Sequence, residues 1–185
     1  MYEGCNKTAL SSQKNIADSF IKLLRNEEYS KISISEICKQ ADVSRQTFYT
    51  LFESKENIVA FVLAKHYDFQ PAHECKCKGT PTLTQLSEAY SKYILSKKEI
   101  LQLLVKNKII YMMQCNLYNA FSSCKEMHFD DDVVVNNITA DFLAAGLTII
   151  AKHYCLNSDK ITEDQLKALI YDLFSGKKFT CGNED

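Results

Sequence analysis

The sequence has little glycine and proline and no long uninterrupted apolar run. Only five Gly and two Pro occur in 185 residues, which leaves little material for the turns of a many-stranded β protein. Leu, Ile, Ala and Lys instead recur at helical spacings, and this periodicity predicts an all-α fold. The longest apolar run, residues 142–151, is interrupted by Thr148 and reaches half of the roughly 20 residues that a membrane span requires. We therefore expect no transmembrane helix.

The sequence motifs of common enzyme classes are missing as well. There is no glycine-rich phosphate-binding motif, no G-x-S-x-G and no H-E-x-x-H, and the four His are dispersed. We therefore expect neither an enzyme nor a bound cofactor.

The eight Cys form no C-x-x-C pair and are scattered through helical patterns, which favours reduced and mostly buried thiols. His73, Cys75 and Cys77 leave a metal or redox site open, since Lys76 and Lys78 would lower the pKa of a neighbouring thiol. No fourth ligand stands at a recognisable spacing. A loop without a metal is the favoured interpretation of this segment.

The charges are distributed unevenly along the chain. The formal net charge of −1 divides into 0 for residues 1–68, +5 for residues 69–125 and −6 for residues 126–185. A nucleic-acid-binding protein often carries a basic domain, and here composition gives no such signal. The first seven residues contain neither a basic segment nor a following apolar segment of the secretory kind. We expect a cytoplasmic protein with no membrane partner.

The first third of the chain predicts four helices. The first follows Ser11-Ser12 and buries Ile16, Phe20 and Leu24. The second covers residues 34–41 and begins at a capping box of Ser33 and Glu36. The third runs from a cap at Ser44 to Thr50, after Asp42 has broken the second. The fourth begins at Ser54.

The third of these helices is short and cannot bury all of its polar side chains. Val43, Phe48 and Phe52 can point inward. The residues that cannot all be buried with them are Arg45, Gln46, Thr47 and Tyr49. Two helices joined by a three-to-four-residue turn, the second presenting polar groups at its start, are typical of a helix-turn-helix.

The residues themselves resemble a known family. Residues 32–58, ISISEICKQADVSRQTFYTLFESKENI, are similar to the signature of TetR/AcrR-type bacterial transcriptional regulators, and the resemblance covers roughly residues 10–66. The capped second helix, the A-x-V-S turn, the T-F-Y triplet and the S-K-E start of the fourth helix occur in order without a gap. Asp42 stands where Gly is commonest, and Leu51 stands where many members carry His or Tyr, so we expect no phosphate contact from Leu51.

The resemblance implies a helix-turn-helix DNA-binding domain, residues 1–53, followed by a larger helical effector-binding and dimerisation domain, residues 54–185. The implied protein binds double-stranded operator DNA as a homodimer and responds to an unknown small molecule, with repression as the favoured output. By this resemblance Arg45, Gln46 and Thr47 read bases. The residues implied to contact the backbone or otherwise reach DNA are Ser35, Ser44, Tyr49 and Lys55. A co-regulator of the same fold that acts through protein contacts without binding DNA remains the alternative.

The rest of the chain predicts helices over residues 84–96, 98–105 and 108–124, a long helix after Asp130–Asp132 and a last helix after Thr162. Aromatic and Met side chains at helical spacing suit an apolar effector site or simply the core; they are Tyr90, Tyr93, Tyr111, Met112, Met113, Tyr118 and Phe121. The candidates for the dimer interface, with the intrachain core as the open alternative, are Phe142, Ala145, Gly146, Ile149, Leu166, Ile170 and Phe174.

Overall fold

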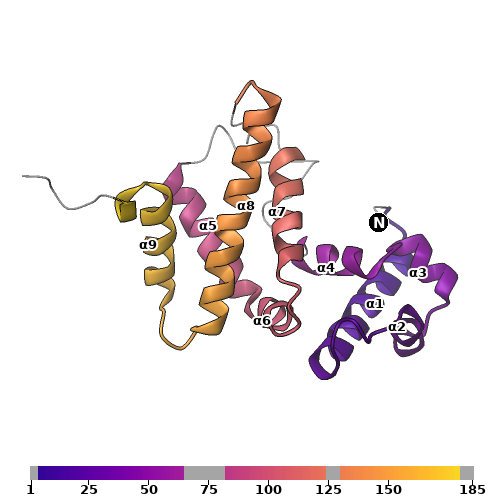
Figure 1. Ribbon diagram of the computed structural model, residues 1–185. Helices are drawn as coiled ribbons and strands as arrows, with labels where there is room; N and C mark the ends of the chain where they lie inside the picture. The colour runs from indigo at the N-terminus through magenta and orange to yellow at the C-terminus, as the bar shows by residue number, and fades with distance from the viewer. Residues whose placement is uncertain (1–3, 65–81, 124–129, 180–185) are drawn as a thin grey trace, which may run out of the picture. The chain divides into compact units, whose positions relative to one another are not determined.

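The computed structural model describes residues 4–64, 82–123 and 130–179, and every regular element in these ranges is a helix (Figure 1). The predicted all-α fold is confirmed. The chain divides into two compact units. Unit 1 comprises residues 1–66 and 103–113, and unit 2 comprises residues 67–102 and 114–185.

Unit 1 is built around helix α1, Lys7–Asn26. Its N-cap is Asn6, whose side chain accepts a hydrogen bond from the Thr8 amide at 2.9 Å. The helix therefore begins before the Ser11-Ser12 start that the sequence predicted, because a cap lies further upstream. As predicted, Ile16, Phe20 and Leu24 form its buried row.

Helices α2 (Ile34–Ala41), α3 (Arg45–Leu51) and α4 (Lys55–Ala64) complete this unit together with residues 103–113. The capping box of Ser33 and Glu36 is formed as predicted. Helix α4 packs on α1 through a buried face that includes Ile58 and Leu63. The compact unit thus contains α4, whereas the sequence-based boundary after residue 53 assigned that helix to the second domain.

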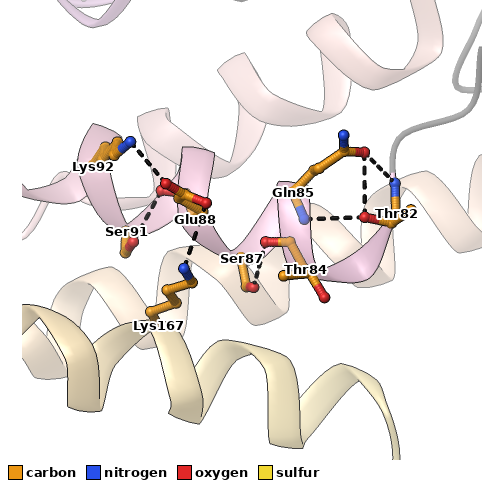
Figure 2. Close-up of polar contacts among 8 residues, drawn as sticks. All are labelled: Thr82, Thr84, Gln85, Ser87, Glu88, Ser91, Lys92 and Lys167. Atoms are coloured by element: carbon orange, nitrogen blue, oxygen red, sulfur yellow. Dashed lines mark hydrogen bonds and ion pairs between the residues drawn. The ribbon is translucent and has the colours of Figure 1, made fainter.

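Unit 2 contains α5 (Leu83–Ser96), α8 (Val133–Leu156) and α9 (Glu163–Phe174), followed by a short 3₁₀ turn, η2 (Lys177–Phe179). Helices α6 (Lys98–Lys106) and α7 (Tyr111–Ser123) each have one part in either unit. Helices α5 and α9 pack side by side. Figure 2 shows one link between them, in which the Glu88 carboxylate lies 2.9 Å from the Lys92 ammonium on α5 and 3.4 Å from that of Lys167 on α9.

Helix α8 carries several large apolar side chains that are exposed in the chain. By length and composition alone, this helix could cross a membrane. The interrupted apolar run at residues 142–151 did not predict this. In its most apolar stretch of 18 residues, 22% of the residues are buried. Asp141 and Lys152 are nevertheless exposed on it, and charges are costly in a bilayer core. The exposed apolar surface of α8 is thus interrupted by charges.

Candidate nucleic-acid interface

The turn between α2 and α3 is closed by local hydrogen bonds. Asp42 adopts a left-handed conformation, with φ 53°, and its amide donates to the Lys39 carbonyl oxygen at 3.4 Å. The Val43 amide donates to the Cys38 carbonyl oxygen at 3.0 Å. Asp tolerates left-handed backbone better than most residues, which explains how it stands where the resembling family has Gly. Helix α3 can therefore begin directly after this turn.

The first turn of α3 is fixed by its cap. The Thr47 amide donates to the Ser44 hydroxyl oxygen at 3.0 Å, and the hydroxyl oxygens of these two residues lie 2.8 Å apart. An N-cap of this kind satisfies a backbone amide that has no partner within the helix. The polar residues that follow Ser44 are thus held on a defined helical turn.

The inner face of α3 is apolar and fully buried. Phe48 and Phe52 have no exposed surface and Leu51 has 3%. The ring of Phe52 packs edge-on against Phe61 of α4, with 5.4 Å between centroids. Burial of Leu51 explains why this position has no polar side chain to offer to a phosphate.

The outer face of α3 carries the predicted base-reading residues. Arg45, Gln46 and Tyr49 are exposed, and Thr47 is half-buried. The Tyr49 ring rests edge-on against the buried Phe48 ring at 5.5 Å and leaves 43% of the residue exposed. Arg45 also acts on Cys38: burial raises the pKa of that thiol, and the positive charge of Arg45 opposes the rise.

Ser35 is exposed on the first turn of α2, beside the capping box. The Glu36 carboxylate accepts hydrogen bonds from the Ser33 amide at 2.8 Å and the Ser33 hydroxyl at 2.7 Å. These bonds lower the pKa of Glu36. The start of α2 therefore presents Ser35 from a capped and locally ordered turn.

Lys55 has partners inside unit 1 that the sequence did not reveal. Its ammonium donates to the carbonyl oxygens of Ile32 at 2.8 Å and Tyr29 at 3.0 Å, and it lies 4.3 Å from the centroid of the Tyr29 ring. An ammonium has three hydrogens to donate. Two of them connect the start of α4 to the segment between α1 and α2, so Lys55 has a structural role whether or not it also meets a phosphate.

Tyr29 and Asn107 belong to the same region and were missed altogether. The Tyr29 hydroxyl donates to the Glu56 carboxylate. Burial and this acidic neighbour raise the pKa of Tyr29, while the same hydrogen bond lowers the pKa of Glu56. The Tyr29 amide donates to the Asn107 side-chain oxygen at 2.9 Å. Nothing in sequence spacing connects two residues so far apart.

Comparison with known proteins identifies this arrangement. Residues 18–62, which include all of α2 and α3, match the family of bacterial regulatory proteins called the tetR family. The expected resemblance to the TetR family is thereby confirmed for this part of the chain. Both helices of the expected helix-turn-helix, α2 and α3, lie within the matched residues.

Individual relatives agree with this assignment. Over 61 residues the chain is 33% identical to the HTH-type dhaKLM operon transcriptional activator DhaS of Lactococcus lactis, a match that covers 33% of each chain. The chain spans about a third of the length of the curated relatives that it matches. The name of the Lactococcus protein describes a regulator of transcription.

Two solved structures share the fold over nearly the whole chain. Lin0861 from Listeria innocua superimposes with a TM-score of 0.67 at 16% identity, over 97% of both chains. A TetR transcriptional regulator from Streptococcus agalactiae superimposes with a TM-score of 0.53 at 18% identity, over 90% of this chain and 95% of that one. These similarities establish the TetR-type fold.

The predicted effector residues divide between the two units. Tyr111, Met112 and Met113 belong to unit 1. The remaining four, in unit 2, are Tyr90, Tyr93, Tyr118 and Phe121. The most unusual of them is Tyr90, whose hydroxyl is buried and has no hydrogen-bond partner within the described ranges. Burial raises the pKa of this hydroxyl. Among the predicted effector residues of unit 2, Tyr90 thus supplies a buried polar group.

The predicted interface residues divide by exposure. Phe142 is 70% and Ile149 57% exposed on α8, whereas Ala145 is half-buried. Leu166 and Ile170 are 0% and 2% exposed within the chain. For these two residues the structure supports the intrachain-core alternative, because α9 packs on α5.

Gly146 and Phe174 also meet within the chain. A Cβ atom on Gly146 would lie 3.4 Å from the Phe174 ring. The two residues are therefore neighbours within the chain.

The segment of His73, Cys75 and Cys77 lies outside the described residues. Of the four Cys inside them, Cys38 and Cys155 are buried, whereas Cys5 and Cys115 are exposed. The expectation of mostly buried thiols thus holds for half of these four. Residues 4–64, 82–123 and 130–179 contain no group of three or more His, Cys, Asp or Glu side chains placed to hold a metal ion.

Proposed function

We propose that this chain is a ligand-responsive transcription regulator that recognises operator DNA with α3. The observation that carries the proposal is the exposed polar row of Arg45, Gln46 and Tyr49 on a helix whose opposite face, Phe48 and Leu51, is fully buried. A helix that is only half-covered by its own domain, in a helix-turn-helix, is suited to lie in the major groove.

Each exposed group fits a particular DNA contact. The Arg45 guanidinium can donate two hydrogen bonds to O6 and N7 of guanine, and the Gln46 amide can pair with N6 and N7 of adenine. The Thr47 hydroxyl is engaged with Ser44, which leaves its methyl group for a thymine methyl. Tyr49 and the two serines Ser35 and Ser44 are placed by this proposal on phosphates, where they fix register.

The proposed regulator binds as a homodimer through α8. One short recognition helix reads only a few base pairs, so useful specificity requires two copies separated by roughly 34–36 Å, one turn of duplex. The exposed side chains of Ile138, Phe142, Ile149 and Leu156 recur at helical spacing along one side of α8. Apolar side chains that project from a helix in this way are suited to pack against their own copies across a two-fold axis.

The proposed effector binds in unit 2 with Tyr90 as its polar anchor. A buried hydroxyl without a hydrogen-bond partner costs about 1–3 kcal/mol. A small molecule with an acceptor atom at this position would remove that cost and gain orientation. A coupling of roughly 1–3 kcal/mol between effector and operator would suffice for regulation. We propose repression as the output, while the activator name of the Lactococcus relative makes activation the alternative to be distinguished.

The decisive experiment is a competition gel shift with the full chain. The probe is the DNA that flanks its own gene, and the competitor is random duplex. We expect the wild type to prefer the flanking DNA at least a thousandfold, and Arg45→Ala to lose most of that preference. Lys160→Ala, which removes an exposed charge in unit 2, is the matched control and should bind normally. Equal binding of both DNAs by the wild type would instead favour the co-regulator that acts through protein contacts.

A further inference from the structure

The last residues of α6 cap the end of α1. The Lys106 ammonium donates to the Arg25 carbonyl oxygen at 3.0 Å, and the Asn107 amide nitrogen donates to the Leu24 carbonyl oxygen at 3.3 Å. Carbonyls in the last turn of a helix have no partner within the helix. Two of those in α1 thus receive side chains from a segment about 80 residues downstream.

Asn107 is at the same time fixed to its own helix. Its side-chain nitrogen also donates to the Leu103 carbonyl oxygen at 3.0 Å. Directly after it, Lys108 adopts a left-handed conformation and the Ile109 amide closes the helix end on the Leu104 carbonyl oxygen at 2.9 Å. The position of the Asn107 side chain therefore follows the end of α6.

On its other side, Asn107 holds Tyr29, and Tyr29 holds the start of α4. The Asn107 oxygen accepts the Tyr29 amide proton at 2.9 Å. The carbonyl oxygen and ring of Tyr29 face the Lys55 ammonium, and its hydroxyl binds the Glu56 carboxylate. Tyr29 thus contacts the first two residues of α4 through three different groups.

The start of α4 is in turn connected to the end of α3. Only residues 52–54 separate the two helices. The Asn57 side chain donates to the Phe52 carbonyl oxygen at 2.7 Å. A change at the start of α4 therefore reaches the helix that carries the proposed base-reading side chains.

We propose that Asn107 is a positioning residue for DNA binding, which acts through Tyr29 on the start of α4 and hence on α3. The inference rests on the proposed function and names a residue on which that function depends. Asn107, Tyr29 and the starts of α4 and α3 all belong to unit 1.

A double-mutant cycle on the full chain tests the proposal. Asn107→Ala removes all three hydrogen bonds of the side chain, and Tyr29→Phe removes only the hydroxyl that binds Glu56. We expect each variant to weaken operator binding roughly tenfold, and the double variant to bind no worse than the weaker single variant, because residues that act in series are not additive. Lys106→Ala removes the hydrogen bond to the Arg25 carbonyl oxygen but leaves the contacts of Tyr29 in place. This variant should bind the operator within twofold of the wild type. Asn107→Asp keeps the acceptor for the Tyr29 amide and should restore most of the affinity.

Two outcomes would overturn this role of Asn107. One is additive losses in the cycle, and the other is a loss of affinity that merely follows the folded fraction measured by circular dichroism. Hydrogen exchange of the amides of residues 55–58 without DNA gives a second readout. We expect Asn107→Ala and Tyr29→Phe each to speed the exchange of these amides. Unchanged exchange in both variants would also overturn the proposal. If the wild type binds no operator, the proposed function fails, while the exchange cycle still decides whether Asn107 acts on α4.

Discussion

The Ser44 hydroxyl accepts the Thr47 amide proton at 3.0 Å and lies 2.8 Å from the Thr47 hydroxyl, at the position where α3 would meet DNA. The same side chain thus begins the helix and, in our proposal, lies beside a phosphate. These two roles make opposite demands on a substitution, because an N-cap favours a negative side chain and a phosphate repels it.

Ser44→Asp and Ser44→Ala should therefore separate folding from binding. Asp is a good N-cap, so we expect Ser44→Asp to keep the free energy of unfolding of the wild type but to lose most operator affinity. Ser44→Ala should lower the free energy of unfolding by about 1 kcal/mol and keep more of the affinity. Chemical denaturation and fluorescence anisotropy with labelled operator measure the two quantities. Equal affinities for the two variants would contradict a phosphate beside Ser44.

Lys55 should contribute to stability as well as to DNA binding. Lys55→Met keeps the apolar stem but removes the hydrogen bonds to Tyr29 and Ile32. We expect it to lower the free energy of unfolding by about 1–2 kcal/mol, and to weaken specific and random DNA alike while the salt slope falls by about one. Lys31→Met, at an exposed surface pair with Glu28, is the control for loss of charge alone. An unchanged salt slope would leave Lys55 with its structural role only.

The left-handed turn at Asp42 should respond to backbone chemistry. At φ 53° a Cβ atom is unfavourable and Gly carries no such penalty. Asp42→Gly should therefore keep or raise the free energy of unfolding by up to about 1 kcal/mol, and Asp42→Ala should lower it by about 1 kcal/mol. Thermal melts of both variants give the answer. If Asp42→Gly were less stable than Asp42→Ala, the left-handed backbone at this position would not be the source of strain that we infer.

The sequence predicted those parts of the fold that depend on local signals. Helix α2 has the predicted bounds because the capping box at Ser33 and the break at Asp42 both lie beside it. The two faces of α3 followed from the alternation of Phe48 with its polar neighbours. In contrast, Lys55 and Asn107 bind backbone carbonyls of distant residues. Every residue type has such a carbonyl, so no side-chain pattern could have indicated these contacts.

Apolar spacing also cannot tell a subunit interface from a core. Leu166 of α9 and Phe142 of α8 follow similar helical patterns, yet the first is fully buried and the second is 70% exposed within the chain. The difference depends on which faces α5 and α9 cover, and that is a tertiary property. Burial in the structure was needed to divide the predicted interface residues into two groups.

The pair of Tyr29 and Glu56 should make the stability of unit 1 depend on pH. The hydrogen bond from Tyr29 lowers the pKa of Glu56 below its ordinary value of 4.5. The contribution of this carboxylate is therefore complete above that value and is lost as the pH falls through the lower pKa of the folded state. The pKa of Tyr29 is raised, so the neutral phenol is favoured and stability falls once the pH exceeds 10. In Tyr29→Phe, denaturation curves recorded across pH should lose the alkaline effect and most of the acid effect. If the loss of stability at low pH is unchanged in Tyr29→Phe, it comes from other carboxylates, such as Glu36.

The exposed face of α8 yields the sharpest prediction about assembly. Phe142 and Ile149 are 70% and 57% exposed in the single chain, so a charge at either position should leave the fold intact. In a two-fold contact each substitution acts twice, and losing about 1.5–3 kcal/mol per buried side chain weakens the dimer by at least roughly a hundredfold. We expect the wild type to sediment as a dimer and Phe142→Asp and Ile149→Asp as folded monomers that bind a half-site no more tightly than random DNA. Lys152→Ala, on the same helix, should remain dimeric. Dimers that persist in both Asp variants would place the interface elsewhere, because two buried carboxylates facing their own copies are strongly unfavourable.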